Sequence, residues 1–105
     1  MNYVSCIIQI LEIPTIESYN DEIEMIKLRV QLPYVRNKVQ SPIIIYLLIW
    51  GDLVYDIVNY YQINDYVLVE GYISISFNNH DKQQLIMINI TKFYPFLFSL
   101  KSNNQ

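Results

Sequence analysis

Within residues 24–32, a strict alternation of apolar and polar side chains from Ile26 to Leu32 constrains the fold more than any other feature. One face of this segment is apolar and consists of Ile26, Leu28, Val30 and Leu32. The other face is polar and carries Lys27, Arg29 and Gln31. A period of two is that of a β-strand with one buried side and one solvent-facing side. The same period returns at residues 66–76 and 85–90, so we expect a protein built mainly of half-buried strands.

Strand-breaking and turn-forming residues divide the chain into five strands. We expect them over residues 2–13, 24–32, 43–50, 66–76 and 85–97. Pro14 and Pro33 end the first two strands, because proline cannot donate to a sheet ladder. The intervening residues 15–22, 34–42 and 77–84 are polar and lack an apolar rhythm, which is typical of connections.

One helix is expected between the third and fourth strands. Apolar side chains recur three or four residues apart from Leu53 to Tyr61. Asp52 stands where its carboxylate could cap the helix N-terminus. Asn64 tolerates the left-handed backbone conformation that commonly ends a helix.

This order of elements predicts the fold class. Three strands, a helix and two strands are the order of the OB-fold, a five-stranded Greek-key barrel that is mostly β. The 105 residues are 52% hydrophobic, which suits one ordinary domain. We expect a single domain over residues 1–98 and a short polar tail over residues 99–105.

Composition argues against an enzyme, a cofactor site or a metal site. Cys6 and His80 are the only residues of their kinds and lie in no cluster of metal-ligand spacing. Two glycines, Gly51 and Gly71, cannot form a glycine-rich phosphate loop. The most apolar segment, residues 43–50, is far shorter than the roughly 20 residues of a membrane helix, so we expect no membrane insertion.

Residue usage points to an origin. The chain has eighteen isoleucines, ten tyrosines, ten asparagines and no alanine. Codons for the first three are rich in A and T, whereas those for alanine are rich in G and C. The chain is therefore expected to be encoded in an A/T-rich genome such as that of an organelle.

Two central motifs resemble the bacterial and organellar single-stranded DNA-binding proteins. The pair Trp50-Gly51 matches the aromatic-glycine pair that opens the family's helix, and residues 67–71 (Val-Leu-Val-Glu-Gly) match its fourth strand. Asn2 and Val4 fall at the family's opening Asn-x-Val. The resemblance spans residues 2–97 and is strongest to the short plastid-encoded proteins of red algae. It implies an OB-fold, single-stranded DNA as ligand, and location in the plastid stroma.

The chain also departs from the family pattern. Ile8 and Asn64 stand where the family usually has glycine, and Ile13 replaces the aspartate before the proline. The residues after Leu100 carry no carboxylate side chain, unlike the family's acidic tip. Recruitment of replication and repair enzymes through such a tip is therefore not expected.

The candidate DNA-binding residues combine positive charge with aromatic faces, which together hold single strands. The set is Lys27, Arg29, Tyr34, Arg36, Lys38, Tyr46, Trp50 and Phe77. Four of the seven basic residues lie between positions 27 and 38, so the patch is locally positive although the net charge is −3. By the resemblance, Trp50 and Phe77 fall at or near base-stacking positions, and Tyr34 lies near another.

Each of these residues also has a purely structural interpretation. Trp50 could close one end of the barrel, since tryptophan is usually well buried. Tyr34 and Phe77 could be ordinary loop aromatics. The basic side chains could simply form a solvated surface.

The third strand suggests a second function. Ile44 and Leu48 share the outward face with Tyr46 and Trp50, and such a row of apolar groups is typical of protein interfaces. Ile44, Tyr46 and Leu48 are therefore candidate interface residues, in a homo-oligomer or a larger complex. The alternative hypothesis is an OB-fold adaptor subunit of an organellar assembly that has lost nucleic-acid binding.

Overall fold

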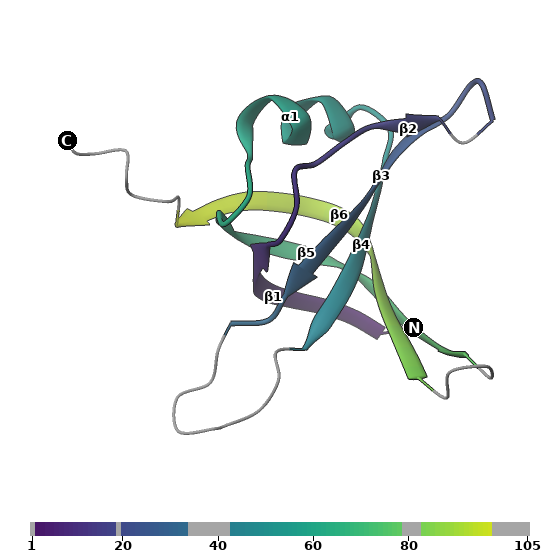
Figure 1. Cartoon of the computed structure of the whole chain (residues 1–105), viewed down its shortest axis with the longest axis vertical. Coiled ribbons are helices and arrows are strands. Elements are labelled where there is room, and N and C mark those ends of the chain that lie inside the picture. Colours follow the sequence, from purple (N-terminus) through teal and green to yellow (C-terminus); the bar gives the residue numbers. More distant parts are fainter. Residues whose placement is uncertain (1, 19, 34–42, 79–82, 98–105) are drawn as a thin grey trace.

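Six strands and one helix make up residues 2–18, 20–33, 43–78 and 83–97, the part of the chain that the computed structural model describes (Figure 1). In chain order the elements are β1 (Asn2–Ile10), β2 (Glu17–Ser18), β3 (Glu24–Gln31), β4 (Ile44–Trp50), α1 (Leu53–Tyr60), β5 (Tyr66–Asn78) and β6 (Gln83–Leu97). The strands curve around one another, and α1 lies across one end of them (Figure 1).

The sheet closes into a barrel. Its strand order is β1-β5-β6-β4-β3-β2, and β1 also pairs with β3, which joins five strands into a ring. β4 and β6 pair in parallel, whereas the other pairings are antiparallel. β2 contributes only two residues, paired to the start of β3. The predicted five-stranded Greek-key OB-fold is confirmed, with the helix between the third and fourth strands of the ring.

The core is made of the inward-facing residues of every barrel strand and of two residues from α1. Its fully or almost fully buried apolar members are Ile8, Ile10, Ile26, Leu28, Val30, Ile45, Leu47, Ile49, Val54, Ile57, Val67, Val69, Ile88 and Phe93. Most are β-branched, a shape that packs well on a pleated surface. Val54 and Ile57 bring α1 onto the end of the barrel, so the helix buries its apolar side there.

The first strand is shorter than predicted, because it changes partners. Residues 2–9 pair with β5, whereas Gln9 and Ile10 pair with β3. Beyond that crossing, the Ile10 amide donates to the Asp65 carbonyl at 2.9 Å, and the Ile10 carbonyl accepts from the Asn64 amide at 2.8 Å. These two hydrogen bonds satisfy the backbone groups of Ile10 without a neighbouring strand. The strand therefore ends at Ile10 instead of continuing to residue 13.

The predicted carboxylate cap on α1 is wrong. Asp52 occupies the N-cap position but has helical dihedral angles and makes no side-chain capping hydrogen bond. The amides of Val54 and Tyr55 donate instead to the carbonyls of Gly51 and Asp52, both at 3.1 Å. These tight turns occupy the donors that a capping carboxylate would take. Asn64 does adopt the left-handed conformation, with φ of 77°, but four residues beyond the end of the helix.

The fourth and fifth barrel strands are longer than predicted. The ladder of β5 and β6 continues through the pair Phe77–Gln84, a region expected to be a turn. Ile75 lies on the apolar side of the alternation at residues 66–76, which would place it toward the core, yet it is 59% exposed. Two paired strands satisfy each other's backbone without a core beneath them, so this ribbon can extend past the barrel although Ile75 and Phe77 stay exposed. The expected tail at residues 99–105 and the connection at 34–42 lie outside the described residues.

Candidate nucleic-acid interface

We call the outward-facing side of β3 and β4 the outer face. It carries four of the candidate binding residues, namely Lys27, Arg29, Tyr46 and Trp50. Lys27 and Arg29 are exposed, while their neighbours Ile26, Leu28 and Val30 are fully buried. On β4 the same alternation buries Ile45, Leu47 and Ile49, and turns outward Ile44, Tyr46, Leu48 and Trp50. Strand periodicity therefore separates the core from the candidate site residue by residue.

Strand register brings the basic and aromatic side chains together. Arg29 lies opposite Tyr46, and Lys27 lies opposite Leu48. The Lys27 ammonium nitrogen is 5.1 Å from the centroid of the Tyr46 ring, within the range of a cation–π contact. Among the described residues, neither Lys27 nor Arg29 forms an ion pair with a carboxylate. Their charges are therefore available to an anionic ligand at this face.

Trp50 lies at the end of the outer face and is partly accessible. Its side chain is 39% exposed, and it stands opposite Met25 of β3. The indole Nε1–H donates to Asn89 Oδ1 on β6, at 3.3 Å. This exposure argues against the interpretation of Trp50 as a plug of the barrel end, and the hydrogen bond holds the ring in a defined orientation.

Sequence reasoning missed the contribution of β6 to this surface. The parallel pairing sets Met87 beside Tyr46 and Asn89 beside Leu48. Asn89 is also opposite Tyr72 of β5, which is 46% exposed. The alternation of residues 85–90 puts Met87 and Asn89 on the side opposite Ile86, Ile88 and Ile90. Nothing local in the sequence indicated that β4 would be their neighbour.

The apolar row on β4 is less exposed than its sequence suggests. Ile44 is 36% exposed, whereas Tyr46 and Leu48 are half-buried and have β3 on one side and β6 on the other. Lys27 approaches the Tyr46 ring, and β6 flanks the same stretch. The accessible apolar surface therefore lies mainly at the two ends of β4.

The remaining predicted site residues are not joined to the outer face by the described contacts. Phe77 belongs to β5 and is 57% exposed on the ribbon that extends past the barrel. It pairs with Gln84, whereas the part of β6 that pairs with β4 begins at Met87. Tyr34, Arg36 and Lys38 lie outside the described residues.

Charge is distributed unevenly around the outer face. The middle carries Lys27 and Arg29, and the Arg29 amide donates to Glu12 Oε2 at 2.9 Å. Near Trp50 the surface is acidic: a depression of about 320 Å³ is lined by Glu22, Ile23, Glu24, Gly51, Asp52 and Tyr55. The Tyr55 hydroxyl donates to Glu24 there. An anionic chain would therefore bind most favourably over the middle of β3 and β4.

The described residues contain neither a metal-binding cluster nor a helix that could span a membrane. Within residues 2–18, 20–33, 43–78 and 83–97, no group of three or more His, Cys, Asp or Glu side chains could hold a metal ion. In the same residues, no helix combines the length and apolarity needed to cross a membrane. Burial raises the pKa of the half-buried Cys6 thiol, which lowers its thiolate content and its reactivity.

Solved structures with the same fold come from single-stranded DNA-binding (SSB) proteins. The SSB domain of a Synechococcus sp. protein superposes with a TM-score of 0.70 at 20% identity, covering 90% of this chain and 94% of that one. A small single-stranded DNA-binding protein from Streptomyces coelicolor gives 0.70 at 12% identity, covering 92% and 96%. The second SSB protein of Mycobacterium smegmatis gives 0.64 at 18% identity, covering 89% and 86%. These likenesses establish the fold.

Sequence comparison adds the family. No protein-family model matches the chain. A protein of Trieres chinensis named "Putative single-stranded DNA-binding protein ycf41" is 39% identical over 102 residues, which cover 92% of this chain and 90% of that protein. With this identity along nearly the whole length of both chains, the protein belongs to the ycf41 family of single-stranded DNA-binding-type proteins.

Proposed function

We propose that the protein binds single-stranded DNA on the outer face of β3 and β4, without catalysis. The observation that carries the proposal is the exposed pair Lys27 and Arg29 set directly against Tyr46, with Trp50 on the same strand. The name of the Trieres chinensis relative refers to the same ligand, as do the names of the structural neighbours.

The arrangement suits an extended single strand for a physical reason. Phosphates are attracted by the cations of Lys27 and Arg29, while unstacked bases regain stacking on aromatic rings. Tyr46 and Trp50 are four residues apart on one face of a strand, so they stand about 13 Å apart along it. That spacing places a cation beside one ring and leaves the other ring partly open.

Binding of oligo-dT should quench the fluorescence of Trp50, the chain's only tryptophan. A base stacked on the indole provides the quenching, and phosphate contacts make the affinity fall as salt rises. For single strands, log K should fall with log salt by about 0.7 for each phosphate neutralised. The measurement is a fluorescence titration at low and moderate salt. No quenching and no salt-dependent binding at micromolar protein would refute the proposal.

The double variant Lys27→Gln/Arg29→Gln is the matched control for the electrostatic part. Both side chains are exposed, so the fold should be retained. If each cation contacts a phosphate, the salt slope should become shallower by about 1.4. An unchanged slope would place the phosphate contacts elsewhere on the protein.

A second candidate function rests on the apolar end of the same strand. We propose that Ile44, with Tyr46 and Leu48 behind it, contacts another protein, either a second copy of this chain or a subunit of a larger assembly. Its support is the 36% exposure of Ile44 beside two half-buried apolar neighbours. Apolar surface of this kind is often covered by a partner.

The variant Ile44→Asp should lower the molecular mass of the protein in solution, if this face joins copies of the chain. A carboxylate would have to be desolvated at the contact, which opposes association. Sedimentation velocity of both proteins at matched concentrations measures the change. If both sediment as the same oligomer, this face does not hold the copies together. If both are monomers, only the adaptor form of the proposal remains.

We further propose that the protein works in the plastid stroma. Two observations support this location: the residue usage, with eighteen isoleucines and no alanine, and the "ycf" designation of the relative, which is used for reading frames of plastid genomes. Detection of the protein in isolated, protease-treated plastids would test it.

A further inference from the structure

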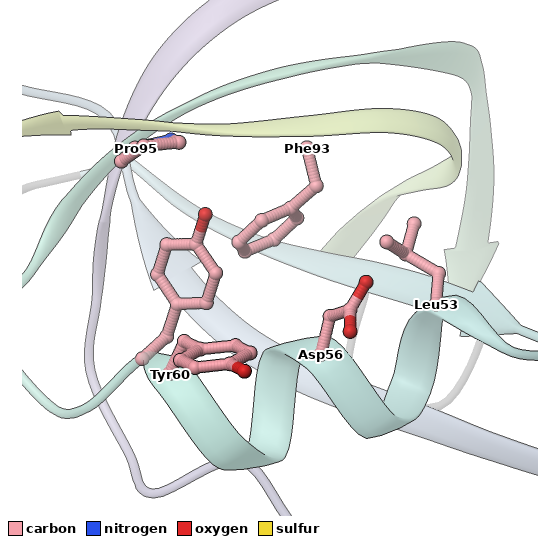
Figure 2. Close-up of a pocket in the computed structure, with 6 residues that line it drawn as sticks. Leu53, Asp56, Tyr60, Phe93 and Pro95 are labelled. Carbon is pink, nitrogen blue, oxygen red and sulfur yellow. The ribbon is translucent and has the colours of Figure 1, made fainter.

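A cavity of about 440 Å³ lies between α1 and the last part of β6 (Figure 2). Its lining consists of Leu53, Asp56, Tyr60, Tyr61, Phe93 and Pro95. None of these residues belongs to the proposed DNA-binding surface. The volume falls within the range of about 300 to 1,000 Å³ typical of small-ligand sites.

Three aromatic rings wall this cavity at different depths. Phe93 is 9% exposed and forms the inner wall, whereas Tyr60 is 72% exposed and stands at the rim. The Tyr61 ring meets Phe93 edge to face, with centroids 4.8 Å apart and planes at 78°. Rings set at large angles to one another offer π faces in more than one direction to a group between them.

A single carboxylate supplies the charge of the cavity. Asp56 lies three residues after Leu53 and four before Tyr60, so all three occupy one side of α1. Its carboxylate and the Phe93 ring point into the same space (Figure 2). Among the described residues, those that line the cavity include no basic side chain.

Nearby groups strengthen the negative potential. The pKa of Tyr61 is raised, first by burial and then by the negative charges of Asp65 and Asp56, which disfavour a phenolate. Asp65 is 1% exposed and accepts the Gln62 amide at 2.9 Å, so its charge lies just behind Tyr61. An anion would be repelled here, and an apolar ligand would strip water from Asp56 without replacing it.

We propose that this cavity binds a flexible organic cation, a guanidinium or alkylammonium group, between the Asp56 carboxylate and the aromatic walls. Cations are attracted to ring faces within about 6 Å of the centroid, and a carboxylate in the same cavity adds direct charge pairing. Leu53 and Pro95 provide apolar surface for the aliphatic stem of such a ligand. This inference does not depend on DNA binding.

The test compares two ligands that differ only in charge. N-acetyl-arginine amide and N-acetyl-citrulline amide have almost the same shape, but only the first carries a cation. In an NMR titration, the arginine derivative should shift the ring resonances of Tyr60, Tyr61 and Phe93 saturably. Its affinity should exceed that of the citrulline derivative by about tenfold.

Two exposed aspartates on neighbouring turns give a matched pair of variants. Asp56→Asn should remove most of the preference for arginine over citrulline, whereas Asp52→Asn should leave it unchanged because Asp52 does not line the cavity. Tyr60→Ala should weaken binding several-fold without harming the core, since Tyr60 is largely exposed. Equal binding of both ligands, or an unchanged preference in Asp56→Asn, would overturn the proposal.

The biological source of the cation can be separated in the same titration. A blocked Gly-Arg-Gly tripeptide represents an arginine on a partner protein, and spermidine represents a free polyamine. Tighter binding of the tripeptide would support a protein ligand, and tighter binding of spermidine a free one. Failure of both to shift the cavity resonances would refute the cation site even if oligo-dT binds normally.

Discussion

Replacing Gly71 by alanine should lower the free energy of unfolding by about 3 kcal/mol or more. A Cβ atom at position 71 would lie 2.1 Å from the carbonyl oxygen of Asn89 and 2.9 Å from Ile88 Cγ2. The oxygen belongs to the backbone of the neighbouring strand, so no side-chain rotation can relieve the contact. The register of β5 and β6 also shifts between Glu70 and Gly71, which brings the two backbones close. Urea denaturation followed by circular dichroism measures the loss.

Gly51→Ala is the control for this prediction. Gly51 has a φ of 79°, and nothing lies within 4 Å of a Cβ placed there. The substitution should cost only the strain of a left-handed alanine, about 1 to 2 kcal/mol. If the two variants lose equal stability, the close approach at Gly71 does not limit the fold.

The Gly71 variant should also affect the outer face. Asn89 is the residue whose carbonyl a new methyl group would push, and its side chain accepts the hydrogen bond from Trp50. A shift of β6 at this point would change the orientation of the indole. Any Gly71→Ala protein that remains folded is therefore expected to bind single strands more weakly than the wild type.

The alternation of apolar and polar residues predicted the core well, because a barrel strand has one buried side and one solvent-facing side. The buried Ile26, Leu28 and Val30 are the residues that the pattern places inward, and Lys27 and Arg29 are those that it places outward. In β4, whose residues 44–50 are all apolar, only the two-residue period of a strand gives the buried set Ile45, Leu47 and Ile49. Burial of one face is a local property that a sequence records directly.

Partner strands were harder to predict because they depend on contacts far apart in the chain. The parallel pairing of β4 with β6 joins residues about forty positions apart and adds Met87 and Asn89 to the candidate surface. The switch of β1 from β5 to β3 at Gln9 is also long-range. Order of elements implied a barrel, but not which side chains would meet across it.

Local rules failed where backbone groups found other partners. Asp52 has the residue type and position of an N-cap, yet the carbonyls of Gly51 and Asp52 already accept the relevant amides. Phe77 and Ile75 lie in a ribbon outside the barrel, where alternating side chains have no core to pack against. No sequence motif indicates the cavity under α1, because its lining residues Phe93 and Pro95 come from a strand some forty residues after Leu53.

Trp50→Ala should weaken single-stranded DNA binding more than loss of any other exposed aromatic on the barrel. A base stacked on an aromatic ring contributes about 1 to 3 kcal/mol, which corresponds to a loss of affinity between about 5-fold and 150-fold. The indole is 39% exposed and held by Asn89, so its face is presented at little entropic cost. Because the variant lacks tryptophan, fluorescence anisotropy of a labelled oligo-dT is the appropriate measurement.

Two variants separate stacking from other effects of the substitution. Trp50→Phe keeps an aromatic ring but loses the Nε1–H donor to Asn89, and should retain most of the affinity if stacking dominates. Tyr94→Ala removes an aromatic side chain of similar exposure, 42%, from a part of β6 that pairs only with β5. Its affinity should stay within about twofold of the wild type, because an exposed ring distant from the ligand contributes no stacking. Equal losses in Trp50→Ala and Tyr94→Ala would mean that the single strand does not lie on the outer face.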